Sequence, residues 1–227
     1  MPISADFPFQ EYLPFWDALP RELQTELRAA AQLRHAHTDQ VIHTGGRCDG
    51  FFIIVSGRLR CRTAAESGRS ITLFRLFAHD VCLFSASCIL KSISFTVTIE
   101  AECDTDYLRI PPAVYRRVSA ASAQAAQFTN EILASRFSDV MWLMDQLLNR
   151  RMDARIAGFL IEEARLCGSD TLHITHEKIA QHLGSAREVV TRVLNYLAHE
   201  GMITLFRGGI AIADSARLSE LAEDAVP

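Results

Sequence analysis

Three charged residues lie close together near the C-terminal end of the chain. Arg187, Glu188 and Arg192 fall in the first two turns of a predicted helix that opens at Ser185. The forked donors of an arginine match O6 and N7 of guanine, and a glutamate can accept a hydrogen bond from N4 of cytosine. On the outward side of a helix, these residues predict a surface that reads base edges. The alternative is the solvated polar face of an ordinary helix.

The elements around these residues are typical of a helix-turn-helix unit. Thr175 is a good N-cap for a first helix with apolar residues at helical spacing, and Gly184 can adopt the left-handed backbone that ends it. Ser185 then opens the second helix, where Glu188 three positions later would complete a capping box. In units of this kind the second helix lies in the major groove of DNA.

A predicted β-hairpin follows the second helix. Residues 203–206 and 210–212 are β-rich runs that flank a glycine turn, Arg207-Gly208-Gly209. We therefore expect a winged helix-turn-helix domain over residues 151–227. Candidate contacts with DNA phosphates, each equally suited to be a cap or an ordinary surface residue, are Thr175, His176, Ser185, Thr191 and Arg207.

A stretch without glycine or proline, residues 113–150, predicts one long helix. Its apolar residues recur at alternating spacings of four and three, as in the seam of a coiled coil, and Asn130 could set the register between two partners. The predicted dimer seam consists of Ala126, Asn130, Leu133, Phe137, Val140, Met144 and Leu147. Apolar residues expected to pack on the helix's own β-domain are Phe128, Ile132, Trp142, Leu143 and Leu148. The alternative is a single buried helix that uses both faces within one subunit.

The N-terminal half changes from a helical to a β-rich pattern. Residues 8–35 are predicted to be helical, with Pro20 at a first helical position. From residue 41 to residue 110, short β-rich runs alternate with turns such as Ser56-Gly57. Several short strands at near-regular spacing indicate a barrel or jelly roll, so the predicted fold class is α+β.

Composition is that of a folded globular protein. The 227 residues are 49% apolar and 22% charged, and the mean hydropathy is +0.10. A net charge of −4 and a pI near 6.1 argue against non-specific binding of polyanions but allow a local DNA-binding surface.

The sequence also excludes several classes of protein. It contains no run of about 18 apolar residues, and its start lacks the pattern of a signal peptide, so we expect a cytoplasmic protein without a membrane span. Six cysteines without a CxxC pair are expected to be reduced thiols. An enzyme is not expected, because the sequence has no P-loop, HExxH, GxGxxG or nucleophile–base motif.

The order of β-roll, long helix and winged helix-turn-helix resembles the cyclic-AMP receptor protein/FNR (Crp/Fnr) family of bacterial transcription regulators. The segment FFIIVSGRLRCRTAAESGRSITLFRLF, with Gly57 and Gly68 at turns, is similar to the family's β-roll, and SAREVVTRVL is similar to its recognition helix. The resemblance implies a cyclic-nucleotide-binding-like β-roll with N-terminal helices over residues 1–112, a dimerisation helix over 113–150 and the DNA-binding domain over 151–227. It also implies a palindromic operator with half-sites resembling TGTGA, and contact with RNA polymerase if the protein is an activator.

The resemblance places an effector site on residues 80–98. Cyclic-nucleotide binders carry a glycine, a glutamate and an Arg-Ser or Arg-Thr pair there, whereas this segment has none of these and Lys91 is its single cation. A buried phosphate needs charge-assisted donors, so a cyclic nucleotide is not expected. The candidate effector residues are Cys82, Ser85, Ser87, Cys88 and Lys91.

Metal-based sensing is not expected either, although the cofactor is left unidentified. No cysteine precedes Cys48, which excludes the closely spaced N-terminal cysteines of the family's iron–sulfur sensors. Residues 80–98 contain no histidine of the kind that the family's haem sensors use. His35, His37 and His43 could still bind haem, or could be ordinary surface residues. The two cysteines of that segment could respond to redox state or nitric oxide, or could be inert buried thiols.

The sequence therefore predicts a homodimeric transcription regulator that binds double-stranded DNA under the control of an unidentified effector or redox signal. The alternative is a β-roll signalling module whose helical C-terminal domain contacts other proteins.

Overall fold

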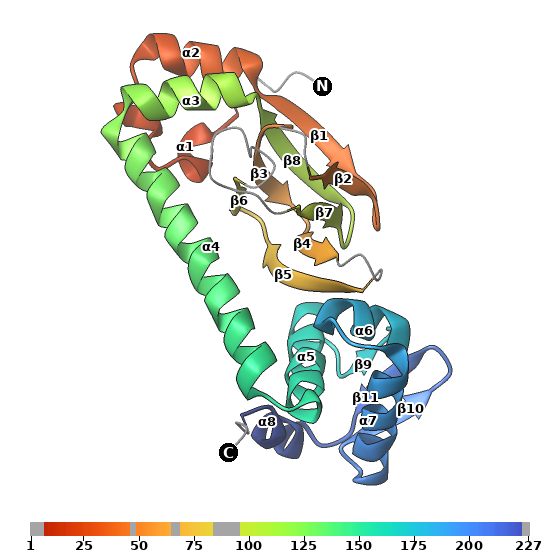
Figure 1. Ribbon diagram of the computed structural model, residues 1–227. Coiled ribbons are helices and arrows are strands. Elements are labelled where there is room, and N and C mark those ends of the chain that lie inside the picture. The colour runs from red at the N-terminus through yellow and green to blue at the C-terminus, as the bar shows by residue number, and fades with distance from the viewer. Residues whose placement is uncertain (1–6, 46–48, 65–68, 84–95, 224–227) are drawn as a thin grey trace. The chain divides into compact units, whose positions relative to one another are not determined.

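The computed structural model describes residues 7–45, 49–64, 69–83 and 96–223 (Figure 1). The chain divides into two compact units, one of residues 1–64 and 73–140 and the other of residues 65–72 and 141–227. Within the described part of the chain, no helix is both long enough and apolar enough to span a bilayer.

The first unit contains short N-terminal helices, two β-sheets and the start of a long helix. Its helices are α1 (Phe9–Tyr12), the 3-10 helix η1 (Trp16–Ala18), α2 (Arg21–Ala30), α3 (Pro112–Ala121) and the part of α4 (Ala123–Asn149) up to residue 140. Its strands are β1 (Gln32–Ala36), β2 (Val41–Thr44), β3 (Phe51–Ser56), β4 (Leu59–Ala64), β5 (Ser70–Leu76, of which residues 70–72 are assigned to the second unit), β6 (Val81–Cys82), β7 (Thr98–Ala101) and β8 (Thr105–Ile110). The prediction of one helix over residues 113–150 is wrong, because Ser122 has an extended backbone (φ −129°, ψ 118°) that separates α3 from α4.

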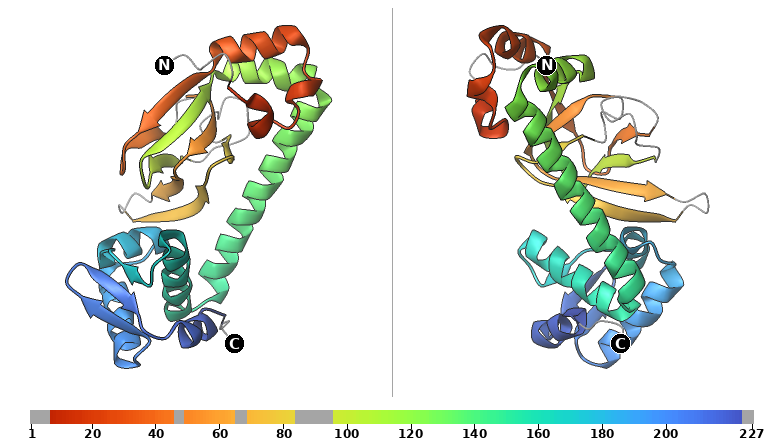
Figure 2. Two further views of the ribbon diagram at one scale, coloured as in Figure 1. Left: turned by 180° about the vertical axis from the view of Figure 1, so that it is seen from behind. Right: turned by 60° about the vertical axis from the view of Figure 1, so that its left-hand side comes forward.

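The strands form two four-stranded sheets in the orders β1-β8-β3-β6 and β2-β7-β4-β5. In the first sheet β8 pairs antiparallel with β1 and β3, and in the second β7 pairs antiparallel with β2 and β4. The predicted β-roll and the α+β class are confirmed. Figures 1 and 2 show α2 and α3 side by side beyond one end of these sheets.

Strand β3 is buried on both faces, which explains its uninterrupted apolar sequence. Because side chains alternate along a strand, Phe52 and Ile54 enter the core between the two sheets, and Phe51 and Ile53 enter a second core. That second core is formed with the N-terminal helices, α3 and the first turns of α4. The helices thus cover the outer face of the sheet that contains β3.

The predicted helix over residues 8–35 is wrong in its extent. The chain forms α1, η1 and α2, and then enters β1, where Leu33 pairs with Leu108 of β8. Pro20 is the residue before α2, with an extended ψ of 141°, and not its first helical residue. Strand pairing with a segment 75 positions away overrides the local helical pattern.

The second unit contains a helix-turn-helix with a hairpin. Its elements are α5 (Met152–Cys167), β9 (Thr171–Leu172), α6 (His176–Leu183), α7 (Arg187–His199), β10 (Ile203–Phe206), β11 (Gly209–Ile212) and α8 (Ser215–Glu223). The strands pair in the order β10-β11-β9, and the hairpin turn is Arg207-Gly208, with Gly208 at φ +87°. Helix α8, which the sequence analysis did not predict, buries Leu218 in the core of this unit.

The turn between α6 and α7 corrects one expectation about capping. Thr175 is the N-cap of α6 as predicted, because its Oγ1 accepts a hydrogen bond from the Lys178 amide at 3.2 Å. The predicted capping box of Ser185 and Glu188 is wrong, since α7 begins at Arg187 and its N-cap, Ala186, makes no side-chain hydrogen bond. The Ser185 amide instead donates to the Ala180 carbonyl at 3.0 Å, so Ser185 belongs to the turn that closes α6.

Candidate nucleic-acid interface

Helix α7 has one buried and one exposed side. Val190, Leu194 and Leu197 lie in the core of the second unit, together with residues of α5 and α6. Arg187 and Glu188 are exposed on the opposite side. The apolar spacing of the sequence therefore fixes which face of α7 is presented outward.

The exposed side of α7 carries a continuous polar surface. A hollow of about 510 Å³ is lined by Arg187, Glu188, Thr191, Arg192 and Asn195. Within the described residues, no hydrogen bond or ion pair occupies the charged groups of Arg187, Glu188 or Arg192. The three residues singled out from the sequence thus lie together with their donors and acceptors available, and Asn195 extends the same face.

Two of the candidate phosphate contacts join the helices of the motif. His176 Nδ1 at the start of α6 lies 2.9 Å from Thr191 Oγ1 of α7. The pKa of His176 lies below its usual value of 6.5. The larger cause is burial of the ring, and the smaller cause is the positive charge of Arg187. The imidazole is therefore neutral at pH 7, where it orients the Thr191 hydroxyl without adding charge.

The remaining candidate phosphate contacts lie at element ends. Thr175 is exposed, but its hydroxyl already serves as the cap of α6. Ser185 is half-buried in the turn before α7. Arg207 is exposed in the turn between β10 and β11. These three side chains are thus distributed over the helix-turn-helix and the hairpin instead of forming one cluster.

Helix α4 exposes large apolar side chains in its second half. The exposed fractions are 68% for Phe137, 50% for Met141, 63% for Trp142, 46% for Met144, 41% for Leu147 and 71% for Leu148. Such side chains are normally covered in a soluble protein. Of the residues predicted to pack on the helix's own β-domain, Phe128 and Ile132 do so, whereas the predictions for Trp142 and Leu148 are wrong because both are exposed.

The predicted dimer seam lies only partly on this exposed stripe. Ala126, Leu133 and Val140 are partly buried, and Leu133 packs against the core of its own unit. Asn130 and Phe137 are exposed, as are Met144 and Leu147. An exposed row with spacings of four, three and four runs through Phe137, Met141, Met144 and Leu148.

The candidate effector residues are described only in part. Cys82 is buried on β6 beside Cys61 of β4. The pKa of the Cys61 thiol is raised well above its usual value, chiefly because the thiol is buried and also because it shares a hydrogen bond with Cys82. This thiol therefore stays protonated. Ser85, Ser87, Cys88 and Lys91 lie outside the described residues.

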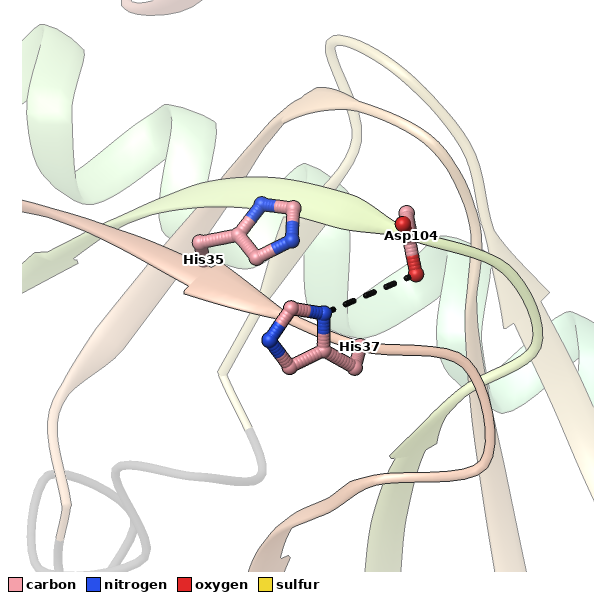
Figure 3. Close-up of side chains that lie close together, drawn as sticks. All are labelled: His35, His37 and Asp104. Carbon is pink, nitrogen blue, oxygen red and sulfur yellow. Dashed lines mark ion pairs between the residues drawn. The ribbon is translucent and has the colours of Figure 1, made fainter.

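Three further side chains form a cluster that no sequence pattern predicted, although two of them, His35 and His37, were considered as alternative haem ligands. His35, His37 and Asp104 lie close together at the end of β1 and in the connection before β8 (Figure 3). The His-x-His spacing is a signal for a shared strand face, but only if residues 32–36 are recognised as a strand. Asp104 joins them through the pairing of β1 with β8, which no local pattern reveals.

Comparison with known proteins decides the family. A model of the Crp-like helix-turn-helix domain matches residues 154–221, and a model of the cyclic nucleotide-binding domain matches residues 33–122. The transcriptional regulator SdrP of Thermus thermophilus is 30% identical over 195 residues, which cover 82% of this chain and 91% of that protein. The chain belongs to the Crp/Fnr family of transcription regulators.

Other Crp/Fnr proteins agree over nearly the whole length. A crystal structure from Eubacterium rectale, described as a transcriptional regulator of the family, has 46% sequence identity and a TM-score of 0.92, and the match covers 94% of this chain and 99% of that chain. The cyclic AMP receptor protein of Thermus thermophilus is 24% identical over 92% of this chain and 95% of its own length. The family and the type of function predicted from the sequence are thereby confirmed.

If the β-roll of this Crp/Fnr protein held a cyclic nucleotide, residues 80–98 would have to supply hydrogen-bond donors for its phosphate. Asp80, the one acid of residues 80–98, is engaged: its Oδ2 accepts from the Phe77 amide at 2.8 Å, and its Oδ1 lies 3.6 Å from Arg136. The segment contains no arginine for a cyclic phosphate. The donor set therefore does not fit a cyclic nucleotide.

Proposed function

We propose that this Crp/Fnr protein binds a palindromic operator as a homodimer, with α7 of each subunit in the major groove of double-stranded DNA. One observation carries this proposal: Arg187, Glu188 and Arg192 line a common exposed hollow, and no hydrogen bond or ion pair within the described residues occupies their charged groups. Charged side chains on a face of this kind are suited to base edges, because they need not break an internal ion pair before binding.

The chemistry of these residues favours a half-site that contains G·C pairs. Arg187 and Arg192 each offer bidentate donors to guanine, and Glu188 offers an acceptor to cytosine. A half-site resembling TGTGA fits this set. Thr175, His176, Ser185 and Thr191 would contact phosphates on either side of the groove, and Arg207 would do so from the wing.

The exposed apolar row of α4 supports association of two chains. Burying Phe137, Met141, Met144 and Leu148 against a second copy removes them from water, and each buried side chain of this size contributes about 1.5–3 kcal/mol. Two parallel copies of α4 would also give the two recognition helices a twofold relationship, which a palindrome mirrors.

Regulation would act through the way in which the two α4 helices meet. An effector or redox event in the β-roll that favours one packing of these helices would change the separation of the recognition helices. Activation would further require a surface that contacts RNA polymerase, and the place of action would be the cytoplasm, where the DNA is.

Selection from a pool of random DNA duplexes tests the proposal. The full chain should enrich palindromes with TGTGA-like half-sites, and a variant carrying Arg187→Ala and Arg192→Ala should not. The selection is run under reducing and under oxidising conditions, because the active state is undefined. Absence of DNA binding in both conditions would contradict the proposal and favour the protein-contacting alternative.

A further inference from the structure

The cluster of His35, His37 and Asp104 is built by the pairing of two neighbouring strands. In the β1–β8 ladder His35 is the partner of Asp106 and Ala36 is the partner of Thr105. One step further along, His37 and Asp104 face each other, with His37 Nδ1 3.9 Å from Asp104 Oδ1. Because side chains two positions apart share a strand face, both imidazoles lie on the same side (Figure 3).

The three side chains offer one ligand atom each within 4.8 Å of one another. They are exposed, with 47% of the His35 side chain, 78% of the His37 side chain and 66% of the Asp104 side chain accessible. Their groups can therefore move toward a common centre without disturbing a packed core.

Asp106 fixes which nitrogen of His35 is available. His35 Nδ1 lies 2.8 Å from Asp106 Oδ1. An ionised carboxylate only accepts hydrogen bonds, so Nδ1 carries the proton and Nε2 keeps its lone pair. Carboxylate–histidine pairs of this kind orient histidines that bind a metal and make them better ligands.

Hydrogen bonds from Thr38 hold Asp104 in place as an anion. Asp104 Oδ1 accepts from the Thr38 amide at 2.9 Å and from the Thr38 hydroxyl at 3.2 Å. Both hydrogen bonds lower the pKa of the Asp104 carboxyl below its usual value of 3.8, and the one from the Thr38 amide has the larger effect. The second carboxylate oxygen remains for another partner.

We infer that His35, His37 and Asp104 bind a divalent transition-metal ion of the zinc class, with water completing the coordination. Two imidazole nitrogens and one carboxylate oxygen suit Zn²⁺ and related ions better than Mg²⁺ or Ca²⁺, which prefer oxygen ligands only. Tetrahedral ligands about 2.1 Å from zinc are about 3.4 Å apart, so the exposed side chains, whose ligand atoms lie within 4.8 Å of one another, need to close by at most about 1.4 Å. Asp106 acts as a positioning residue through its bond to His35.

Titration of the full chain with Zn²⁺ in a calorimeter tests this site. One strong site per chain is expected, with the dissociation constant raised at least tenfold by His37→Ala and by Asp104→Asn. The asparagine variant keeps an oxygen for the Thr38 hydrogen bonds and removes only the charge of the ligand. His199→Ala removes an equally exposed histidine outside the cluster and should leave the affinity unchanged, which controls for general binding by surface histidines.

The absorption spectrum of the Co²⁺ form distinguishes metal binding at the proposed site from metal binding by cysteine residues. Cobalt at the histidine–aspartate site should give visible bands without the intense thiolate-to-cobalt absorption that cysteine ligands produce. Thermal unfolding gives a second measurement, because Zn²⁺ should raise the melting temperature of the parent chain and not that of His37→Ala. Absence of Zn²⁺ binding up to about 1 mM, or equal loss of affinity in His37→Ala and His199→Ala, would overturn the inference.

Discussion

At the scale of single residues, substitution of the exposed arginines of α7 tests the proposal that these side chains read base edges. Arg187→Ala or Arg192→Ala should each weaken binding to the selected operator by about 1–3 kcal/mol and relax the preference at one base position. Fluorescence anisotropy with the operator and with single-base variants measures both effects.

Arg165→Ala is the matched control for this prediction. It removes the same charge from an exposed position of α5 outside the hollow on α7. Affinity for the operator should change little, and base preference not at all. If Arg187→Ala instead weakened binding to all duplexes equally, Arg187 would be a phosphate contact.

A buried tyrosine makes stability depend on alkaline pH. Tyr115 of α3 is fully buried, stacks on Phe51 and lies with its hydroxyl 2.8 Å from Thr129 Oγ1 of α4. Burial raises the pKa of Tyr115 from 10.0 to about 12, although the Thr129 hydrogen bond partly opposes this. Between those two values the folded state retains a proton that the unfolded state has released, so stability falls as pH rises from 10 to about 12.

Urea unfolding at pH 8 and at pH 11 measures this dependence. A shift of about two pKa units corresponds to about 2–3 kcal/mol over the whole window, and about half of this, roughly 1.4 kcal/mol, should be lost by pH 11. Tyr115→Phe should remove most of that loss. At pH 8 the variant should cost only about 1 kcal/mol, because the Thr129 hydroxyl keeps its bond to the Ala125 carbonyl. An unchanged alkaline loss in the variant would refute the assignment to Tyr115.

At the scale of elements, the second half of α4 should control association. Replacing Phe137 and Leu148 together by lysine places two charges on the exposed apolar row and should raise the dimer dissociation constant at least tenfold. Sedimentation equilibrium over a range of protein concentrations measures the constant.

The control for α4 is Gln124→Lys, which adds a charge at an exposed position in the first turn of the same helix. Association should be unaffected. Helix content by circular dichroism should be equal in all three proteins, so that a change in association is not a change in folding. A dimer that survives the double substitution would locate the interface elsewhere.

At the scale of the whole molecule, the proposed twofold pair of recognition helices would fix the spacing of the operator. Two half-sites should lie about one helical turn apart, roughly 34 Å from centre to centre. Inserting about 5 base pairs between them turns one half-site to the opposite side of the duplex. Gel-shift titration should then show affinity close to that of a single half-site, whereas an unchanged affinity would mean that each subunit binds independently.

Much of this organisation follows from local sequence patterns. The amphipathic spacing of Val190, Leu194 and Leu197 requires Arg187 and Arg192 to face outward once the helix forms. Gly184, at φ +67°, ends α6 where the sequence predicts a left-handed residue. Patterns of this kind specify helices and turns because the responsible interactions lie within a few residues of one another.

Other features depend on segments far apart in the chain. Residues 32–36 carry a helical pattern but form β1, because pairing with β8 satisfies their backbone and buries Ala36. The same pairing brings Asp104 and Asp106 to His35 and His37. Sequence periodicity likewise could not divide the apolar residues of α4 between its own core and the exposed row, since that division depends on where the packed core ends.

The sequence by itself determined the family, the order of β-roll, connecting helix and winged helix-turn-helix, and the outward face of the recognition helix, because each of these is encoded by short-range spacing and by residue type. Only the tertiary structure decided which side of α4 is left uncovered, how the turn before α7 is closed, and that two histidines and an aspartate share one surface. These depend on strand register and on the extent of the core, which arise only when distant segments pack together.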